Sequence, residues 1–96
     1  MARIEIAPRA DANLRDLTDT HGLPRATKQR VKRAVRPLRR FPEMGRELTG
    51  RWVRYRWIRG PWRWMILVYT YDRDDDLVII ATIQDGRTAT AATASR

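Results

Sequence analysis

Apolar and charged positions at the start of the chain predict a short strand followed by a helix. Arg3 to Ala7 alternates charged and apolar side chains, which is typical of a half-buried strand. Pro8 ends the alternation and suits the first turn of a helix, where a backbone N–H group has no helical partner anyway. The next positions at helical spacing are Ala10, Asn13, Leu14 and Leu17.

A second, longer helix is predicted after a break from Thr18 to Gly22. His21, the only histidine, lies in this break beside a glycine and is interpreted as a solvent-exposed loop residue. One stripe of the second helix is apolar and consists of Val31, Ala34, Val35, Leu38 and Phe41. Pro37 falls inside that stripe and has no N–H group to donate, so a kink or break is expected around Arg36.

Three strands are predicted in the second half of the chain. The first runs from Arg51 to Ile58, and Arg59 to Trp62 supplies the glycine and proline of a turn. The second extends from Arg63 to Tyr69, and Leu77 to Ile83 forms a buried last strand. Between these two, Asp72 to Asp76 lacks the glycine and glutamate of a calcium loop and is interpreted as a hairpin turn.

Side-chain alternation divides the strand from residue 51 to 58 into two faces. Val53, Tyr55 and Trp57 share one face, which is interpreted as core. The other face carries Trp52, Arg54, Arg56 and Ile58. Because the helices are expected to cover the core side, the face with Arg54 and Arg56 is predicted to stay open.

The order strand, helix, helix, strand, strand, strand predicts an α+β fold with a small, mainly antiparallel sheet and two helices packed on one face. A chain of 96 residues fits one domain with a single small core. We place this domain at residues 1–87. Residues 88–96 are nearly all alanine, threonine and serine, so we expect them to form a flexible tail.

The net charge of +9 is concentrated in the middle of the chain. Residues 23–63 carry 14 basic residues and two acidic ones. On the second helix the basic residues are Lys28, Arg30, Lys32, Arg33, Arg36, Arg39 and Arg40. Such a face suits nucleic acid, an acidic protein or an anionic membrane surface, and charge alone does not choose among them. Solvation is the ordinary interpretation of a charge run, but like charges at helical-neighbour spacing are mildly destabilising, which favours a binding role.

Composition excludes several other classes of protein. The chain has no cysteine, so it has neither disulfide bonds nor thiolate metal sites. Its N-terminus, MARIEIAPRAD, lacks the apolar region of a signal peptide, and its longest apolar run is too short to span a membrane. We therefore expect a cytoplasmic protein with no membrane partner and no cofactor.

Arginines near the turn predicted at Gly60-Pro61 are the main candidates for chemistry. Arg54 and Arg56 are two positions apart on a strand, or about 6.5–7 Å, which is similar to the phosphate repeat of an extended nucleotide strand. Arg63 opens the next strand, so all three are expected to converge at one end of one sheet face. Guanidinium groups bind phosphate oxygens bidentately, and nearby tryptophans can stack on unpaired bases. The plain alternative is an exposed strand that carries arginine for solubility and edge protection.

The chain resembles the RelE/ParE superfamily of toxins from type II toxin–antitoxin modules, from Arg3 to about Ile83. The segments that carry the resemblance are IEIAPRADANLRDL, RVKRAVRPLRRFPEMGRELTG and YRWIRGPWRWMILVY. Within them, Leu48-Thr49-Gly50 and the arginine after an aromatic residue, Trp62-Arg63, are the most telling pieces. The resemblance implies the fold of that superfamily and, as a partner, an acidic antitoxin protein.

Members similar to RelE cut messenger RNA on the ribosome with basic residues, so the resemblance implies a metal-independent endoribonuclease. It implies that Arg54, Arg56 and Arg63 are catalytic, with Arg87 as a further arginine near the end of the last strand. Arg63 would stabilise the negative charge that builds on the phosphate while the 2′-hydroxyl attacks. The residues expected to contact nucleic acid are Arg51, Arg59, Trp52, Arg39 and Arg40.

ParE-like members share the fold but inhibit DNA gyrase and lack the nuclease residues. The RelE pattern places a tyrosine or histidine near the C-terminus, and this chain has neither after Tyr71. That difference favours gyrase inhibition, because arginine stays protonated and is a poor general base. The three matching arginines favour the nuclease. We predict a ribosome-dependent mRNA endonuclease, with a gyrase inhibitor or a non-toxic nucleic-acid-binding relative as alternatives.

Overall fold

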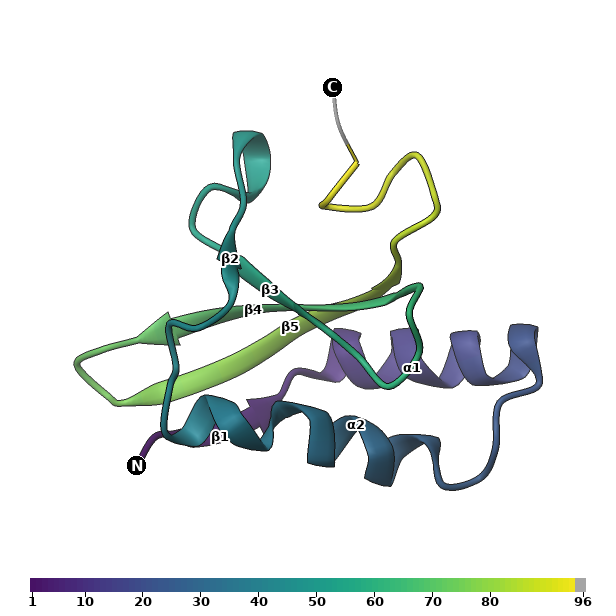
Figure 1. Ribbon diagram of the computed structural model, residues 1–96, viewed down its shortest axis with the longest axis horizontal. Helices are drawn as coiled ribbons and strands as arrows, with labels where there is room; N and C mark the ends of the chain where they lie inside the picture. The colour runs from purple at the N-terminus through teal and green to yellow at the C-terminus, as the bar shows by residue number, and fades with distance from the viewer. Residues whose placement is uncertain (95–96) are drawn as a thin grey trace.

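The computed structural model describes residues 1–94 as a five-stranded mixed sheet with two helices on one face (Figure 1). The strands are β1 (Arg3–Ile6), β2 (Arg46–Glu47), β3 (Arg56–Arg59), β4 (Met65–Asp72) and β5 (Leu77–Asp85). The helices are α1 (Pro8–His21) and α2 (Thr27–Val35), with short 3-10 helices η1 (Arg36–Arg39) and η2 (Gly50–Trp52). The predicted α+β class is confirmed. Within the described residues, no helix is long and apolar enough to cross a membrane.

The sheet is built around the β4–β5 hairpin. Its strand order is β1-β5-β4-β3-β2, in which β1 runs parallel to β5 and the other neighbours are antiparallel. The segment predicted as a hairpin turn joins β4 to β5, and that prediction is confirmed. Here the Asp72 carboxylate accepts the N–H groups of Asp74 and Asp75 at 3.0 and 3.3 Å, a local pattern that favours turns.

The main core lies between the sheet and the helices. Its largest fully buried side chains include Val31, Leu38, Met65, Leu67, Tyr69, Val78 and Ile80. Because strand side chains alternate, β4 directs Leu67 towards the helices and its neighbours Ile66 and Val68 to the opposite face. The predicted stripe of the second helix is buried at Val31, Val35 and Leu38, whereas Phe41 is 59% exposed and does not belong to the core.

The sequence predicted the end of α2 correctly but not the end of α1. α2 stops at Val35 and continues as η1 from Arg36, so the break predicted from Pro37 is confirmed. α1 runs through the predicted break as far as His21, and Gly22 ends it with a left-handed φ of 61°. The interpretation of residues 18–21 as a loop was therefore wrong.

The strand predicted from Arg51 to Ile58 is mostly not a strand. Leu48 donates a hydrogen bond to the Tyr55 carbonyl at 3.1 Å, which closes a loop over residues 49–54 that contains η2. Pairing with β4 begins only at Arg56 and extends to Arg59, which was expected in the turn. Residues 51–54 carry strand-forming side chains, but the loop in which they lie gives them no strand partner.

The connector before this loop contributes the extra strand β2, and Tyr69 holds the connector in place. The buried Tyr69 hydroxyl accepts the Gly45 N–H at 2.9 Å and donates to the Pro42 carbonyl at 2.8 Å. A Cβ atom at position 45 would lie 2.7 Å from the tyrosine ring and 2.8 Å from the Trp57 carbonyl, so only glycine fits. β2 pairs with β3 directly after this point.

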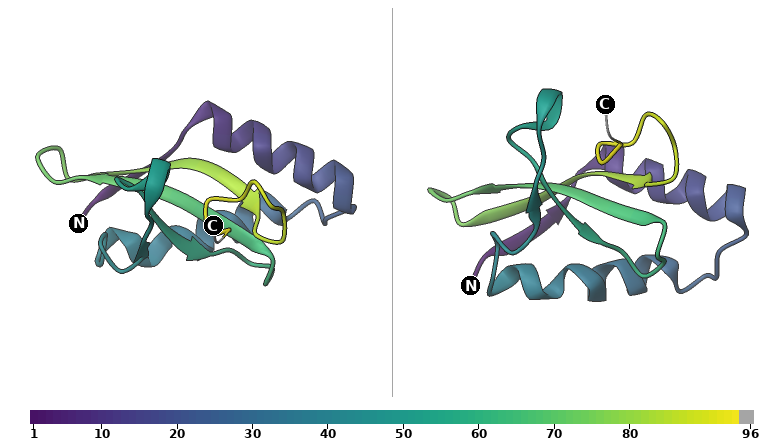
Figure 2. Two further views of the ribbon diagram at one scale, coloured as in Figure 1. Left: turned by 90° about the horizontal axis from the view of Figure 1, so that it is seen from above. Right: turned by 45° about the horizontal axis from the view of Figure 1, so that its top comes forward.

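The C-terminal segment, residues 88–94, crosses the sheet face opposite the helices (Figure 2). Ala91 is 7% exposed and packs in a cluster with Leu48, Ile66 and Val68. The Ala92 N–H donates to the Gln84 side chain at 2.7 Å. The segment therefore contacts the sheet at Ala91 and Ala92, and residues 95 and 96 lie outside the described part. The domain boundary at residue 87 and the flexibility of the tail stay predictions.

Candidate functional site

The arginines predicted to form one site lie at two ends of the β3–β4 hairpin. Arg56 begins β3 and pairs with Tyr69, while Arg59 ends it and pairs with Ile66, next to the turn that contains Arg63. Arg56 and Arg59 are three residue steps apart along β3, which is about 10 Å between their Cα atoms. The predicted convergence of Arg54, Arg56 and Arg63 is therefore wrong.

Arg56 lies on the face of the sheet that the helices cover. It shares this face with Ile58, which packs against the main core. Its guanidinium donates to the carbonyls of Glu43 and Gly45 at 3.1 and 2.9 Å. The prediction that Arg56 lies on an open face was wrong, because the sheet uses this side chain to hold the connector that leads into β2.

Arg54 lies outside the sheet, in the loop between η2 and β3. It is exposed, as is Val53, which is 66% exposed and therefore does not belong to a core face. Strand alternation does not apply to this loop, so the predicted faces hold only from Arg56 onwards. Arg54 is exposed, so a partner can reach its side chain.

The face opposite the helices is an aromatic surface with a thin cover. Trp57 projects there, together with the buried side chains of Ile66 and Val68. Trp52 and Tyr55 extend this surface and meet edge to face, with ring centroids 5.2 Å apart. Residues 88–94 lie over part of it, so this face is less open than the sequence suggested.

A second group of side chains surrounds Trp64 at the other end of the sheet. The Arg87 guanidinium lies 5.1 Å from the centroid of the Trp64 ring, and the His21 ring lies 4.5 Å from it. Arg87 also donates two side-chain hydrogen bonds to Asp85, at 2.9 and 2.8 Å. These bonds lower the pKa of Asp85 to about 2. Arg63 lies in the turn immediately before Trp64, so Arg63 and Arg87 share this end of the sheet.

His21 is the residue of this group that sequence reasoning missed. Its Nε2 atom lies 3.7 Å from an Asp85 carboxylate oxygen. The partner is distant in sequence, so no local motif could have shown it. A signal was nevertheless present, because His21 follows Leu14 and Leu17 at helical spacing and therefore lies on the same side of α1 as these two leucines.

The residues predicted to contact nucleic acid are spread over three places. Arg51 stacks on Trp52 at 5.6 Å, within η2. Arg59 lies 5.9 Å from the Trp57 ring and donates to the Arg63 carbonyl at 2.9 Å. Arg39 ends η1 on the helical side of the molecule, and the next residue, Arg40, is exposed there. Within residues 1–94, these five side chains do not line up as one surface that a nucleic-acid strand could follow.

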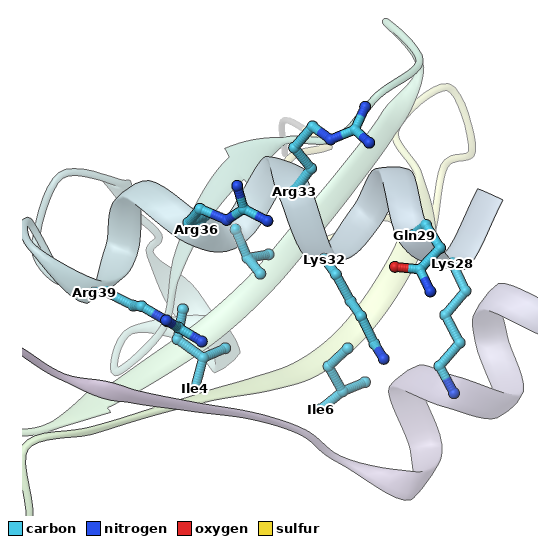
Figure 3. Close-up of a pocket in the computed structure, with 9 residues that line it drawn as sticks. Ile4, Ile6, Lys28, Gln29, Lys32, Arg33, Arg36 and Arg39 are labelled. Carbon is cyan, nitrogen blue, oxygen red and sulfur yellow. The ribbon is translucent and has the colours of Figure 1, made fainter. Parts of the chain in front are cut away.

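A hollow of about 490 Å³ lies between α2, η1 and β1. Ile4, Ile6 and Val35 provide its apolar lining. The polar lining consists of Lys28, Gln29, Lys32, Arg33, Arg36 and Arg39. In Figure 3, Lys32 and Arg39 extend from the helical segment towards β1. We refer to this hollow as the basic groove.

Among residues 1–94, no group of three or more His, Cys, Asp and Glu side chains is arranged to hold a metal ion. Lysine and arginine side chains line the basic groove, and aromatic side chains form the face opposite the helices. Such side chains bind anions and stack on flat groups.

The sequence matches the family described as "ParE toxin of type II toxin-antitoxin system, parDE" over residues 4–89. The chain belongs to this family. It is thus the toxin of a type II toxin–antitoxin system, and the corresponding antitoxin is its partner. No curated protein sequence gives a significant match.

Solved structures similar to this ParE-family toxin share its fold. A chain in the toxin–antitoxin complex RelBE2 from Mycobacterium tuberculosis superimposes with a TM-score of 0.64 at 21% identity, covering 88% of this chain and 96% of that one. A conserved hypothetical protein from Helicobacter pylori gives 0.58 at 15% identity, covering 88% and 94%. Another from the same organism gives 0.55 at 17% identity, covering 86% and 92%.

Proposed function

We propose that this toxin acts by binding DNA gyrase and inhibiting it, without cutting RNA. The observation that carries the proposal is the separation of the predicted nuclease arginines. Arg54 and Arg56 lie at one end of the β3–β4 hairpin and Arg63 at the other, and Arg56 is committed to backbone carbonyls. The match to the ParE family supports the same conclusion.

The physical requirements of the two activities differ. Cleavage by charge stabilisation needs several donors about 3 Å from the oxygens of one phosphate, held there before the reaction. Arg56 does not meet that requirement, because its guanidinium donates to the carbonyls of Glu43 and Gly45. Inhibition by binding needs only a complementary surface, and tryptophan, tyrosine and arginine are the residues that dominate binding energy at protein interfaces. Trp52, Tyr55 and the exposed Arg54 form such a surface beside Trp57.

A ribosome-dependent mRNA endonuclease is the second candidate, and a specific observation favours it. Arg63 and Arg87 share the end of the sheet at which His21 also lies. Histidine can accept a proton from a 2′-hydroxyl, which arginine cannot do. A nuclease built on this chain would therefore use Arg63, Arg87 and His21, instead of the predicted set that includes Arg54 and Arg56. Gyrase and the ribosome are both cytoplasmic, so either activity places the toxin in the cytoplasm.

Two assays on the purified toxin, freed of antitoxin, decide between these activities. The first follows plasmid supercoiling by gyrase, and the second maps cleavage of a ribosome-bound message by primer extension. We expect supercoiling to stop and the message to stay intact. A cut message with normal supercoiling would overturn the proposal in favour of the nuclease.

Variants locate the site under either outcome. For gyrase inhibition, Arg54→Ala should reduce potency by about tenfold, as for an interface arginine. For the nuclease, Arg63→Ala should slow cleavage by about 100- to 1,000-fold, the effect of losing one charge-stabilising donor. Arg39→Ala is the control for both, since it lies on the helical side of the molecule. Circular dichroism of each variant establishes that it is folded.

A further inference from the structure

Another hollow on the helical side of the molecule lies between α2 and the turn that joins β3 to β4. It encloses about 420 Å³ and is lined by Arg30, Arg33, Ala34 and Pro61. Figure 1 shows this turn beside α2. Trp62, the next residue of the turn, packs against the main core and so fixes the turn next to the helix. We refer to Arg30, Arg33, Pro61 and Trp62 as the arginine–tryptophan site.

Arg30 is held over the ring of Trp62 in a way that suits it for binding an anion. Its guanidinium carbon lies 5.5 Å from the centroid of that ring. The attraction of a cation to an aromatic face uses no N–H donor, so the guanidinium can bind an anion at the same time. Because Trp62 is partly buried against the core, Arg30 rests on a fixed support. A side chain positioned in advance loses less conformational entropy when it binds.

Arg33 provides a second guanidinium next to the first. The two arginines are three residues apart in α2, about 4.5 Å of rise, so their side chains are neighbours on the helix. Both are exposed, and neither forms an ion pair within residues 1–94. In Figure 3, Arg33 extends from the helix on the side away from Ile4 and Ile6. The site therefore suits a ligand that carries several negative charges close together.

We propose that the arginine–tryptophan site binds the phosphate backbone of duplex DNA. Guanidinium groups pair bidentately with phosphate oxygens. Duplex DNA carries one negative charge about every 1.7 Å along its axis, so both arginines can reach a phosphate together. Contacts to the backbone carry no information about base sequence, so the binding is independent of sequence. The choice of DNA rests on the proposed function, because a toxin bound to gyrase lies beside the DNA on which gyrase acts.

The lining of the hollow favours a phosphate backbone over an acidic peptide. Apart from the ring under Arg30, its apolar part consists of Ala34 and Pro61, which form no pocket for a large apolar side chain. Protein interfaces take most of their affinity from such buried anchors. A phosphate backbone needs none, because the release of its condensed counterions favours binding to arginine.

The position of the site is compatible with simultaneous binding of gyrase. The arginine–tryptophan site lies on the helical side of the molecule, whereas Trp52, Tyr55 and Trp57 belong to the opposite face of the sheet. Figure 1 shows the helices on one side of the strands and the loop with η2 on the other. The toxin can therefore contact protein with one face and DNA with the other.

Binding of a labelled duplex to the purified full-length toxin, freed of antitoxin, tests the proposal without gyrase. Fluorescence anisotropy measures the affinity for a duplex of about 20 base pairs between about 50 and 300 mM salt. For the wild type, the logarithm of the affinity should fall against that of the salt concentration with a slope of about −2 or steeper, since each phosphate contact contributes about −0.9. Arg30→Ala with Arg33→Ala should make this slope shallower by about 2 and weaken binding at low salt by at least about tenfold.

Two further variants separate the site from general charge. Arg3→Ala with Arg9→Ala removes the same charge from exposed arginines outside α2 and should change the slope by less than about 0.5. Arg30→Lys keeps the charge but fits the tryptophan ring less well and loses the bidentate contact. It should leave the slope unchanged and weaken binding by about two- to fivefold. Circular dichroism establishes that each variant is folded.

Three results of the binding experiment would overturn the proposal. An equal change of slope in the two alanine pairs would place the binding outside the site. Tighter binding of single-stranded RNA than of the duplex, lost in the variant of Arg30 and Arg33, would make this an RNA site. Stronger competition by polyglutamate than by unlabelled duplex would make it a site for an acidic protein.

The supercoiling assay tests separately whether the site serves inhibition. Arg30→Ala with Arg33→Ala should reduce the potency of gyrase inhibition by at least about threefold, because the toxin then loses its hold on the DNA. Unchanged potency, despite weaker DNA binding, would exclude a role of the site in inhibition. If the wild type binds DNA but leaves supercoiling intact, the proposed function fails while the DNA site stands, so the two failures are distinguishable.

Discussion

The two faces of the sheet are both apolar, but they are covered by very different material. Two helices cover one face and bury Leu67, Tyr69 and Ile80 completely. The other face is covered by a loop of small side chains, of which Ala91 is the most buried. Figure 1 shows the helices on one side of the strands and the C-terminal segment on the other. The same alternating strand β4 supplies both faces.

This difference separates the part of the molecule that stabilises the fold from a part that is suited to binding. Stabilisation grows with the apolar area removed from water, and the helix-covered face removes far more of it. The other face keeps Trp52, Tyr55 and Trp57 only partly buried under a segment that donates a hydrogen bond to Gln84. A partner can gain apolar contacts there without disrupting the main core.

The largest effect is expected from removing a large side chain on the helix-covered face. Leu67→Ala should lower the free energy of unfolding by about 2–5 kcal/mol, because it leaves a cavity that the helices cannot fill. Ile66→Ala is the matched variant, since it removes a side chain of the same size from the next residue, on the other face. Ile66→Ala should lower the free energy of unfolding by about 2 kcal/mol, near the lower end of that range, because the loop that covers Ile66 can relax into the space. Urea unfolding of both measures the contrast, and equal costs would break the comparison.

A smaller loss is expected when the hydroxyl that holds the connector is removed. Tyr69→Phe leaves the Gly45 N–H and the Pro42 carbonyl without this partner, which should cost about 1–3 kcal/mol. Tyr71→Phe is the control, because its hydroxyl bonds to Asp76 in an exposed position. Chemical denaturation should show a change within about 0.5 kcal/mol for that variant. If both variants behave alike, the connector does not depend on Tyr69.

The end of the sheet should respond to acid through Asp85. Hydrogen bonds from Arg87 lower its pKa from the ordinary value of 3.8 to about 2 in the folded protein. The ionised carboxylate is therefore stabilising at pH above about 4, and this contribution is lost as the pH falls from about 4 towards 2. Asp85→Asn should be less stable than wild type at neutral pH and equally stable near pH 2, measured by thermal unfolding. A stability difference that does not vary with pH would contradict this role.

The smallest effect is expected from shortening the cover of the aromatic face. Deletion of Thr90 to Arg96 should leave the melting temperature nearly unchanged, because Ala91, the one buried side chain among residues 90–94, contributes about one methyl group or 0.8 kcal/mol. The tryptophans should become more accessible to a fluorescence quencher. A fall in melting temperature of many degrees, well above about 1 kcal/mol for a domain of this size, would show that the two faces are equally important.

Much of the fold follows from local patterns in the sequence. The alternation before Pro8, the helical stripes and the aspartate-rich turn placed β1, the helices and the β4–β5 hairpin, because each depends on neighbouring residues. Pro37 located the end of α2 because its effect on a helix is local. The resemblance to the toxin superfamily agrees with the family match over residues 4–89.

The site depended on contacts that no local pattern contains. Arg56 was placed on the wrong face because covering a face requires a partner distant in sequence, here the helices and the connector held by Tyr69. His21 likewise lies next to residues that are distant in sequence, Trp64 and Asp85. The sequence by itself determined β1, the two helices and the β4–β5 hairpin, and that a basic surface exists. The tertiary structure alone decided which arginines share a neighbourhood, because strand alternation defines two faces but does not say which of them is covered.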